Sequence, residues 1–360
     1  MIGSSFSQYI HGIEGIEQLL KKTSITQEVQ VQTTDTPQPN VAQTGSNDAL
    51  STPQKLGAIF KTMRPRQWTK NLTVFIGIIF AQQLFSTPSL IRTVLAFATF
   101  CIASSIIYLL NDLLDLDNDR QHPKKRHRPL ASGRLPISWA IAAIGVLFVA
   151  CVGLTVCIFL VPIGMDNDLY EAYGGANLLF ALTIATYLVL MVLYSIRLKH
   201  VVLIDVFIIA TGFVLRILAG AVVIPVSISP WLYLVACLLS LFLALSKRRN
   251  ELVLLQGQAS SHRQILKEYS IPMLDQMITI VATTTIMAYG LYTVQGTTGN
   301  HRLIITIPLV LYGIFRYLYL VYMRMEGGSP EEVLLRDRHM LGTVILCTVL
   351  IFVILYVLPQ

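Results

Sequence analysis

Nine long apolar segments constrain the fold of this chain more than any other feature of its sequence. Each is close to the roughly 20 residues that an α-helix needs to cross the hydrocarbon core of a bilayer. Only helices and closed barrels satisfy their backbone hydrogen bonds in lipid, and segments of this length are helical. The sequence therefore predicts an all-α, polytopic membrane protein with nine transmembrane helices, over residues 69–86, 90–113, 137–163, 176–195, 201–224, 230–246, 275–296, 302–324 and 340–358.

Charged residues are scarce, and their placement indicates the setting of the chain. They make up 13% of the residues, about half of the quarter that is usual in soluble domains. The net charge of +7 would suit nucleic acid in a soluble protein, but here the basic residues stand in short segments between apolar ones. We therefore expect no nucleic acid as partner. The expected partners are the membrane and phosphate-bearing molecules.

Lys and Arg concentrate in alternate segments between the apolar runs. By the positive-inside rule, this places the N-terminus in the cytoplasm and the C-terminus outside. The sequence thus predicts a multi-pass protein of the cell (inner or plasma) membrane, with its acidic and basic groups facing the cytoplasm.

Residues 1–55 have a different composition from the rest. They are rich in Gln, Thr, Ser, Asn and Pro and contain no spanning run. Segments of low hydrophobicity cannot bury enough apolar surface to fold. We therefore predict a disordered, dispensable cytoplasmic tail over residues 1–55 and a membrane domain over 56–360.

An acidic motif ends the second apolar segment. Asn111, Asp112, Asp115 and Asp119 are spaced to share one helical face, while Asp117 points elsewhere. Adjacent carboxylates at the end of a membrane helix repel one another, and a divalent cation relieves that cost. Mg²⁺ prefers a few carboxylates together with substrate phosphate oxygens. The motif therefore predicts a Mg²⁺-diphosphate site with Asp112, Asp115 and Asp119 as catalytic metal ligands, rather than a solvated acidic helix end.

Basic and polar residues in the same set of segments are candidates for binding phosphate groups. Arg126 and Arg128 follow the acidic motif and can hold phosphate in bidentate fashion. An intramembrane Asp or Arg needs a polar cavity or a partner, which applies to Asp205 and to Arg216, for which a purely structural pairing is the alternative. The predicted substrate-binding residues are Lys70, Asn111, Arg126, Arg128, Tyr194, Lys199, Asp205, Lys247 and Arg248.

Residues 111–136, NDLLDLDNDRQHPKKRHRPLASGRLP, resemble the first motif of the UbiA superfamily of intramembrane prenyltransferases. The order of nine helices, with this motif between the second and third, is similar too. The resemblance covers about residues 55–360 and implies a UbiA-like helical bundle with Mg²⁺ as cofactor. Members of the superfamily carry a second Asp-rich motif after the sixth helix, where this chain has SKRRNEL at 246–252.

A basic segment in that place suits an anionic ligand better than a second metal ion. With RPRQWTKN at 64–71 and the segment 194–221, it resembles the branch of decaprenyl-phosphate phosphoribosyltransferases. The resemblance implies transfer of 5-phosphoribose from phosphoribosyl diphosphate to a polyprenyl phosphate, with release of diphosphate, for the synthesis of cell-envelope glycolipid precursors.

Two other functions fit parts of the pattern. A conventional prenyltransferase would move an isoprenoid from its diphosphate to an aromatic acceptor with the same Asp motif, but the basic residues at 247–249 weigh against it. A transporter of phosphorylated metabolites is compatible with Asp205 and Arg216, but the charged groups gather on one side of the membrane, and no pair of broken helices marks a midplane site. The sequence leaves open whether the protein forms a homo-oligomer.

Overall fold

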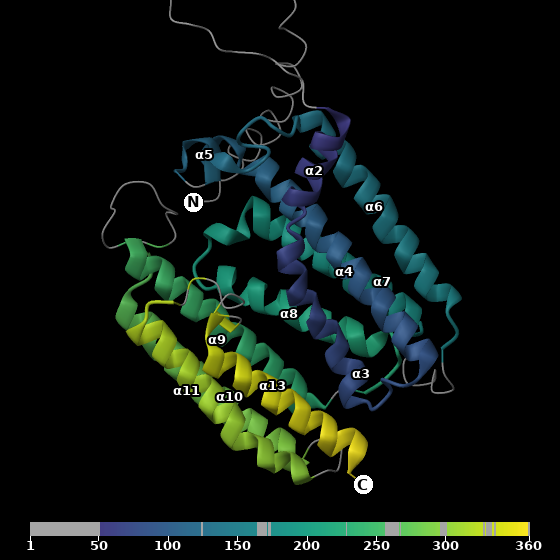
Figure 1. Ribbon diagram of the computed structural model, residues 1–360, viewed down its shortest axis with the longest axis vertical. Coiled ribbons are helices and arrows are strands. Elements are labelled where there is room, and N and C mark those ends of the chain that lie inside the picture. Colours follow the sequence, from purple (N-terminus) through teal and green to yellow (C-terminus); the bar gives the residue numbers. More distant parts are fainter. Residues whose placement is uncertain are drawn as a thin grey trace, which may run out of the picture. The chain divides into compact units, whose positions relative to one another are not determined.

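The computed structural model describes residues 51–123, 125–163, 171, 174–227, 229–255, 266, 268–295, 301–326, 328, 333–334 and 336–358. Within these ranges the regular secondary structure is helical and contains no β-strand (Figure 1). The predicted tail, except for its last five residues, lies outside the described ranges. The described part belongs to one compact unit, Leu50–Gln360.

Eight helices in the described part are long and apolar enough to cross a membrane, judged by length and composition. Their limits agree within four residues with eight of the nine predicted segments, except that α9 continues nine residues beyond the predicted end at 246 and so contains Lys247 and Arg248. The agreement confirms the all-α membrane fold. They are α4 (Thr87–Leu114), α6 (Ile137–Leu160), α7 (Ala176–Ile196), α8 (Ile204–Val222), α9 (Pro230–Leu255), α10 (Ile271–Gln295), η6 with α11 (His301–Thr306 and Ile307–Met323), and α13 with η7 (Arg338–Phe352 and Val353–Val357).

The first predicted span, 69–86, has a different structure. It is a 3₁₀-helix, η1 (Pro65–Phe75), followed by a five-residue α-helix, α3 (Ile76–Phe80). A 3₁₀-helix rises about 2.0 Å per residue and an α-helix about 1.5 Å, so the two pieces together reach about 30 Å, the thickness of the hydrocarbon core. The stretched segment is therefore still long enough to cross.

Two glycines explain how this segment packs. A methyl group added at Gly77 would stand 2.9 Å from the backbone of Gly220 and Ala221 in α8, and one added at Gly220 would overlap the carbonyl of Val74. The backbones of α3, η1 and α8 are therefore in direct contact, which leaves no room for a side chain at either glycine.

Two shorter helices were not expected from the hydropathy pattern. α2 (Thr52–Thr62) precedes η1 and begins inside the stretch predicted to be tail, and α5 (Leu116–Gln121) follows α4. Both lie at the end of the bundle opposite the last turn of α13 (Figure 1).

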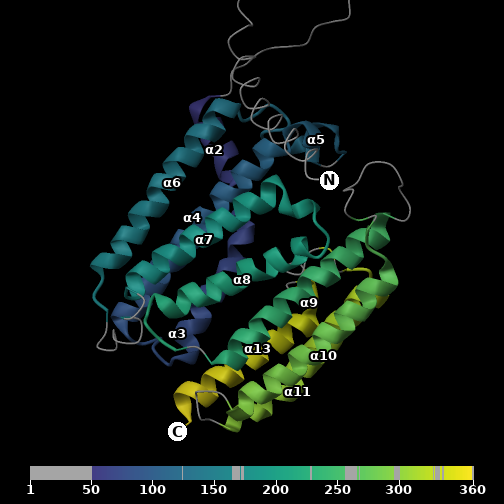
Figure 2. The same cartoon turned by 180° about the vertical axis from the view of Figure 1, so that it is seen from behind.

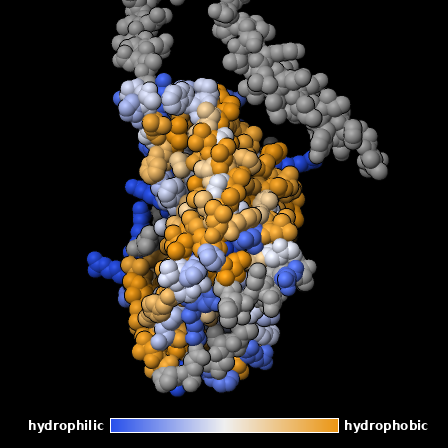
Figure 3. Space-filling model, turned by 90° about the vertical axis from the view of Figure 1, so that its right-hand side faces the viewer, coloured by the Kyte–Doolittle hydropathy of each residue, from blue (hydrophilic) through white to orange (hydrophobic). Residues whose placement is uncertain are grey.

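The core of the bundle is divided between two groups of helices. One apolar cluster joins η1, α3, α4, α6, α7 and α8, and a second joins α8, α9, α10 and α11. α8 contributes to both and lies between the two groups in the two opposite views (Figure 2). By contrast, α6 and α13 have only 11% of their most apolar window buried. Hydrophobic residues cover much of the face shown in Figure 3, as expected for a surface in lipid.

Two buried arginines hold the first group together. Arg216 donates hydrogen bonds to Asn71 Oδ1 at 2.7 Å and to the Tyr187 hydroxyl at 2.9 Å, which is the structural pairing considered for it. Arg92, 1% exposed, donates to the carbonyls of Ile158 and Val223 near the C-terminal ends of α6 and α8. Each guanidinium group donates hydrogen bonds to buried oxygen atoms that would find no donor in the lipid.

Candidate active site

The acidic motif lies where α4 gives way to α5. α4 ends at Leu114, Asp115 leaves the helical conformation with φ −95° and ψ 11°, and α5 begins at Leu116. The predicted continuous helical face is therefore broken at its central carboxylate. This break gives Asp115 a different environment from Asp112 and Asp119.

Asp112 and Asp119 are brought together by a shared arginine. Both are 2% exposed. Nη1 of Arg128 lies 3.1 Å from Asp112 Oδ1 and 2.6 Å from Asp119 Oδ2. Arg64 reaches the same Asp112 oxygen at 2.5 Å, and Lys125 lies 3.9 Å from Asp119. Two buried carboxylates are thus neutralised by cations that are themselves partly exposed.

Asp115 faces the connection between α7 and α8. Its Oδ1 accepts a hydrogen bond from Lys199 Nζ at 2.7 Å, and Lys199 is buried in the short helix η4 (Leu198–His200). Asp117 points away, with its side chain 90% exposed and Arg120 as its 3.4 Å partner. The distinction between Asp117 and the other three carboxylates therefore appears in the structure as a difference in burial and partners.

A second charged cluster surrounds Asp205 at the start of α8. Asp205 is fully buried and pairs with Arg248 Nη2 of α9 at 2.5 Å. Tyr269 donates a hydrogen bond to Asp205 Oδ1 at 2.8 Å and accepts one from the Leu203 amide at 2.7 Å. Burial, and then the neighbouring carboxylate, raise the pKa of Tyr269 to about 12, so its hydroxyl stays protonated and able to donate. Arg248 also pairs with Glu251 at 2.5 Å.

The residues after Arg248 tie α9 to other elements. Arg249 Nε lies 2.5 Å from Asp275 of α10, and its guanidinium stacks on Tyr322 of α11 at 4.1 Å. Asn250 donates to the carbonyl of Met325, just beyond α11, at 2.7 Å. Successive residues of the basic segment therefore fasten α9 to α8, to α10 and to the end of α11.

The remaining predicted residues are less buried than the carboxylates Asp112, Asp119 and Asp205. Lys70 on η1, Tyr194 near the end of α7 and Lys247 on α9 are half-buried. Arg126 is exposed and its guanidinium lies 3.4 Å from His127, so the structure does not bring it to the carboxylates as it does Arg128. The contacts thus separate the two arginines that the sequence treated alike.

The oxygen donors at the α4–α5 junction fit Mg²⁺ in kind. Three carboxylates stand beside Asn111, whose Oδ1 is buried and lacks a hydrogen-bond partner among the described residues. An orphaned buried acceptor is costly unless it has a ligand. In the described chain, however, no three His, Cys, Asp or Glu side chains converge closely enough to hold an ion. Arg64, Arg128 and Lys199 pair with these carboxylates.

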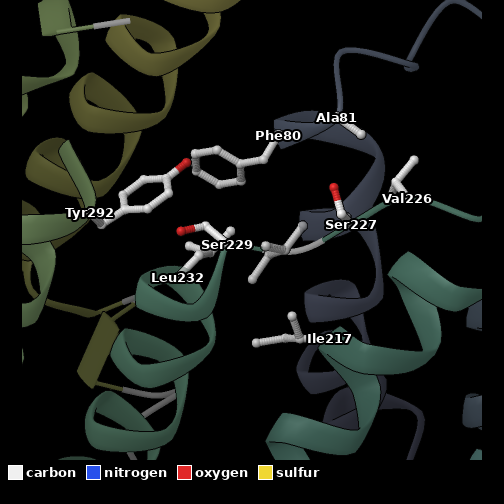
Figure 4. Close-up of a pocket in the computed structure, with 10 residues that line it drawn as sticks. Phe80, Ala81, Ile217, Val226, Ser227, Ser229, Leu232 and Tyr292 are labelled. Carbon is white, nitrogen blue, oxygen red and sulfur yellow. The ribbon is translucent and has the colours of Figure 1, made fainter. Parts of the chain in front are cut away.

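A separate small cavity lies between α3, α8, α9 and α10 (Figure 4). The rings of Phe80 and Tyr292 face each other there at 5.8 Å, edge to face, and Ser229 lies below them. Among the described residues that line this cavity, none is acidic or basic, in contrast to the charged α4–α5 junction.

Several residues at the charged clusters, Arg64, Tyr269 and Glu251 among them, were not among the predicted site residues. Arg64 stands directly before Pro65 and has φ 55° and ψ 62°, an uncommon left-handed conformation for a non-glycine residue. Tyr269 and Glu251 flank the long connection between α9 and α10. The only sequence signals were the basic run 64–70 and the length of that connection, and neither identifies a particular side chain.

Comparisons with known proteins agree with the fold and with the motif. Residues 71–331 match the model of the UbiA prenyltransferase family. The chain is 32% identical over 333 residues to the decaprenyl-phosphate phosphoribosyltransferase of Corynebacterium glutamicum, covering 90% of this chain and 95% of that protein. A protein of the same name from Mycolicibacterium smegmatis is 32% identical over 301 residues, covering 79% and 87%.

Solved structures show the same fold at lower identity. A UbiA homologue from Archaeoglobus fulgidus, bound to GPP and Mg²⁺, superposes with a TM-score of 0.59 at 15% identity, over 83% of this chain and 99% of that chain. A digeranylgeranylglyceryl phosphate synthase gives a TM-score of 0.58 at 19% identity, over 85% and 100%. The resemblance of residues 111–136 is thereby confirmed: the chain belongs to the UbiA prenyltransferase family.

Proposed function

We propose that this protein transfers 5-phosphoribose from phosphoribosyl diphosphate to a polyprenyl phosphate and releases diphosphate, as a step in making cell-envelope glycolipid precursors. The observation that carries the proposal is the interleaving of carboxylates and cations at the α4–α5 junction, where Arg128 bridges Asp112 and Asp119. Relatives named decaprenyl-phosphate phosphoribosyltransferase, which align over most of this chain, support it.

The cations of this junction suit a ligand with several phosphate groups. Arg64 and Arg128 hold the buried Asp112 through side chains that are each 28% exposed, so a phosphate can approach both guanidinium groups. Guanidinium groups bind phosphate oxygens in bidentate fashion. Lys199 adds a third positive charge beside Asp115. Two anionic substrates repel each other strongly, and bringing them together requires such fixed cations.

In the proposed reaction, an oxygen of the lipid phosphate attacks C1 of the ribose while the bond between C1 and the diphosphate oxygen breaks. The electron pair of that bond leaves with the diphosphate. The nucleophile is already anionic, so no general base is needed. Asn111, Asp112, Asp115 and Asp119 are the residues that would hold Mg²⁺, which when bound neutralises charge on the leaving diphosphate.

The lipid substrate sets where the chemistry takes place. The polyprenyl chain stays among apolar helices, and its phosphate reaches the end of the bundle that carries α5. The basic segments between the apolar runs favour the cytoplasm as the compartment of that end. The donor, a soluble sugar phosphate, would then enter from the cytoplasm.

A prenyl transfer to an aromatic acceptor is the second candidate. It is favoured by the solved A. fulgidus homologue, which carries GPP and Mg²⁺. That chemistry uses carboxylates at both Asp-rich positions to hold metal ions. In this chain the second position has Lys247, Arg248 and Arg249, with Arg248 and Arg249 committed to ion pairs, which fits a second metal ion poorly.

The deciding experiment follows the donor. Purified protein in lipid nanodiscs receives labelled phosphoribosyl diphosphate with and without a polyprenyl phosphate, and, separately, a prenyl diphosphate with an aromatic acid. We expect diphosphate release and labelled lipid only in the first reaction with both substrates present. Prenylation of the aromatic acid, without ribosylated lipid, would establish the second candidate instead.

A further inference from the structure

α2 presents an apolar strip that the described chain covers only in part, since the ring of Trp68 packs edge to face against Phe60 with the ring centroids 6.2 Å apart. Leu56 and Phe60, one helical turn apart, are each 56% exposed. An adjoining face of the helix, with Ala58 and Ile59, packs against a small apolar cluster of α4 and α6. α2 is therefore fixed to the bundle on one side and leaves two large apolar side chains on another.

The neighbouring residues of α6 indicate that this strip faces the membrane. Lys55 of α2 lies 5.2 Å from the ring of Trp139, in the first turn of α6. Ile137 and Ile141 of that helix are 45% and 59% exposed, and α6 has only 11% of its most apolar window buried. The strip on α2 thus continues the lipid-facing surface of α6 at its first turn, where a membrane helix meets the headgroups.

Two exposed basic residues follow the strip in the sequence. Lys61 on α2 and Arg66 at the start of η1 are exposed. A helix with apolar residues on one flank and Lys or Arg on another lies in the bilayer interface, and anionic lipids strengthen its binding. Apolar continuity with α6 and the positive charges both match an anionic phospholipid surface.

We propose that α2 is a membrane-surface helix that inserts Leu56 and Phe60 among the acyl chains and holds anionic phospholipid headgroups with Lys61 and Arg66. Met63, the residue after α2, accepts a hydrogen bond from Ser105 of α4 at 3.3 Å, and Arg64 follows it. Binding of α2 to the bilayer surface therefore fixes how deep the backbone at Arg64 lies relative to the headgroups. Arg64 is the residue that pairs with Asp112. This surface is independent of which reaction the protein catalyses.

Hydrogen exchange of the full-length protein tests the proposal without an activity assay. The protein is placed in nanodiscs of phosphatidylcholine alone and of phosphatidylcholine mixed with phosphatidylglycerol, and exchange of the amides in 52–63 is followed by mass spectrometry. Each basic residue near an anionic surface strengthens binding by about fivefold, so exchange should slow by roughly five- to twentyfold with phosphatidylglycerol.

Three variants separate the contributions. Lys61→Gln should reduce the effect of phosphatidylglycerol by about fivefold, whereas Arg302→Gln, which removes one exposed charge on η6 at the other end of the bundle, should leave it unchanged. Leu56→Ser/Phe60→Ser should speed exchange of 52–63 in both kinds of nanodisc. Equal exchange of the unaltered protein in both lipids would overturn the proposal. So would slow exchange that persists in the double variant, because another protein segment would then cover α2.

Discussion

The two charged clusters of this protein are built on opposite plans. At the α4–α5 junction, two buried carboxylates share cations whose side chains are partly exposed: Asp112 contacts both Arg64 and Arg128, and Arg128 also contacts Asp119. At the end of α9, the buried Arg248 pairs with the fully buried Asp205, and Arg249 pairs with Asp275 of the next helix.

The difference lies in how readily each cation can exchange its partner. A partly exposed guanidinium can turn from a carboxylate to a phosphate at little cost, since water screens the intermediate positions. Separating Arg248 from Asp205 would leave the fully buried carboxylate of Asp205 without a compensating charge, even though Arg248 keeps its second partner, Glu251. The first cluster therefore has the properties of a binding site, and the second has those of a fastening between helices. Lys247, half-buried beside Arg248, is the member of the second cluster best placed to act on a ligand.

Removal of divalent metal should have the largest effect and should act on the first cluster alone. With EDTA we expect transfer to stop completely and Mg²⁺ or Mn²⁺ to restore it, because a diphosphate leaving group and Asp112, Asp115 and Asp119 together demand a hard cation. The thermal unfolding temperature in detergent should change little, since the second cluster contains no metal ligand. Full activity after exhaustive chelation would exclude a role for metal.

Substitution of the three carboxylates at the α4–α5 junction should come next. Asp112→Ala, Asp115→Ala and Asp119→Ala should each lower kcat by at least 10²- to 10³-fold, roughly the cost of losing one group that stabilises the transition state. Asp117→Ala is the matched control, because Asp117 is exposed and contacts only Arg120 among the described contacts, and it should be mild. Steady-state kinetics of the four variants, with membrane insertion verified, decides the matter. Equal behaviour of all four would remove the basis for choosing these carboxylates.

Lys247 and Arg248 were predicted from the sequence to bind an anion together, and the structure separates their expected effects. Lys247→Ala should lower kcat/KM by about one to two decades, which corresponds to the roughly 1.5–3 kcal/mol of a charge-assisted contact. Lys247→Asp should be worse, through repulsion of the anion. Arg248→Ala should instead cost about 3–5 kcal/mol of stability, because it strands Asp205.

Kinetics with both substrates varied, together with thermal unfolding, separates these two outcomes. Arg248→Ala/Asp205→Asn serves as the control, since removing both charges should recover much of the lost stability. If Lys247→Asp gained activity with a prenyl diphosphate donor and an aromatic acceptor, prenyl transfer would replace the proposed reaction. A fully stable but inactive Arg248→Ala would make Arg248 a ligand-binding residue rather than a fastening.

The sequence predicted the membrane fold well because hydropathy over about 20 residues is a strong and local signal. It missed the 3₁₀ structure of residues 65–75, a segment that packs at Val74 against Gly220 of α8, far along the chain. The same limit applies to the charged residues. Spacing on an ideal helix set Asp117 apart from its neighbours, but it could not reveal the break at Asp115. Nor could it reveal that Arg248 forms an ion pair with Asp205, because tertiary packing determines which charged residues meet.

The smallest effect is expected from deleting the N-terminal tail. This deletion tests whether either charged cluster needs a group from outside residues 51–360. Deleting residues 1–50 leaves Ser51, whose side chain and Gln54 cap the start of α2, and every residue of the two clusters. The deleted stretch has low hydrophobicity and no run long enough to span the membrane. We therefore expect kcat/KM to stay within about twofold, since surface changes of this kind alter free energies by roughly 0.5 kcal/mol or less. The measurement compares truncated and full-length protein at equal amounts in nanodiscs. The contrary outcome is a severe loss of turnover in a truncated protein that inserts into the membrane and has an unchanged unfolding temperature. The tail would then supply a group to the active site, and the α4–α5 junction would be incomplete without it.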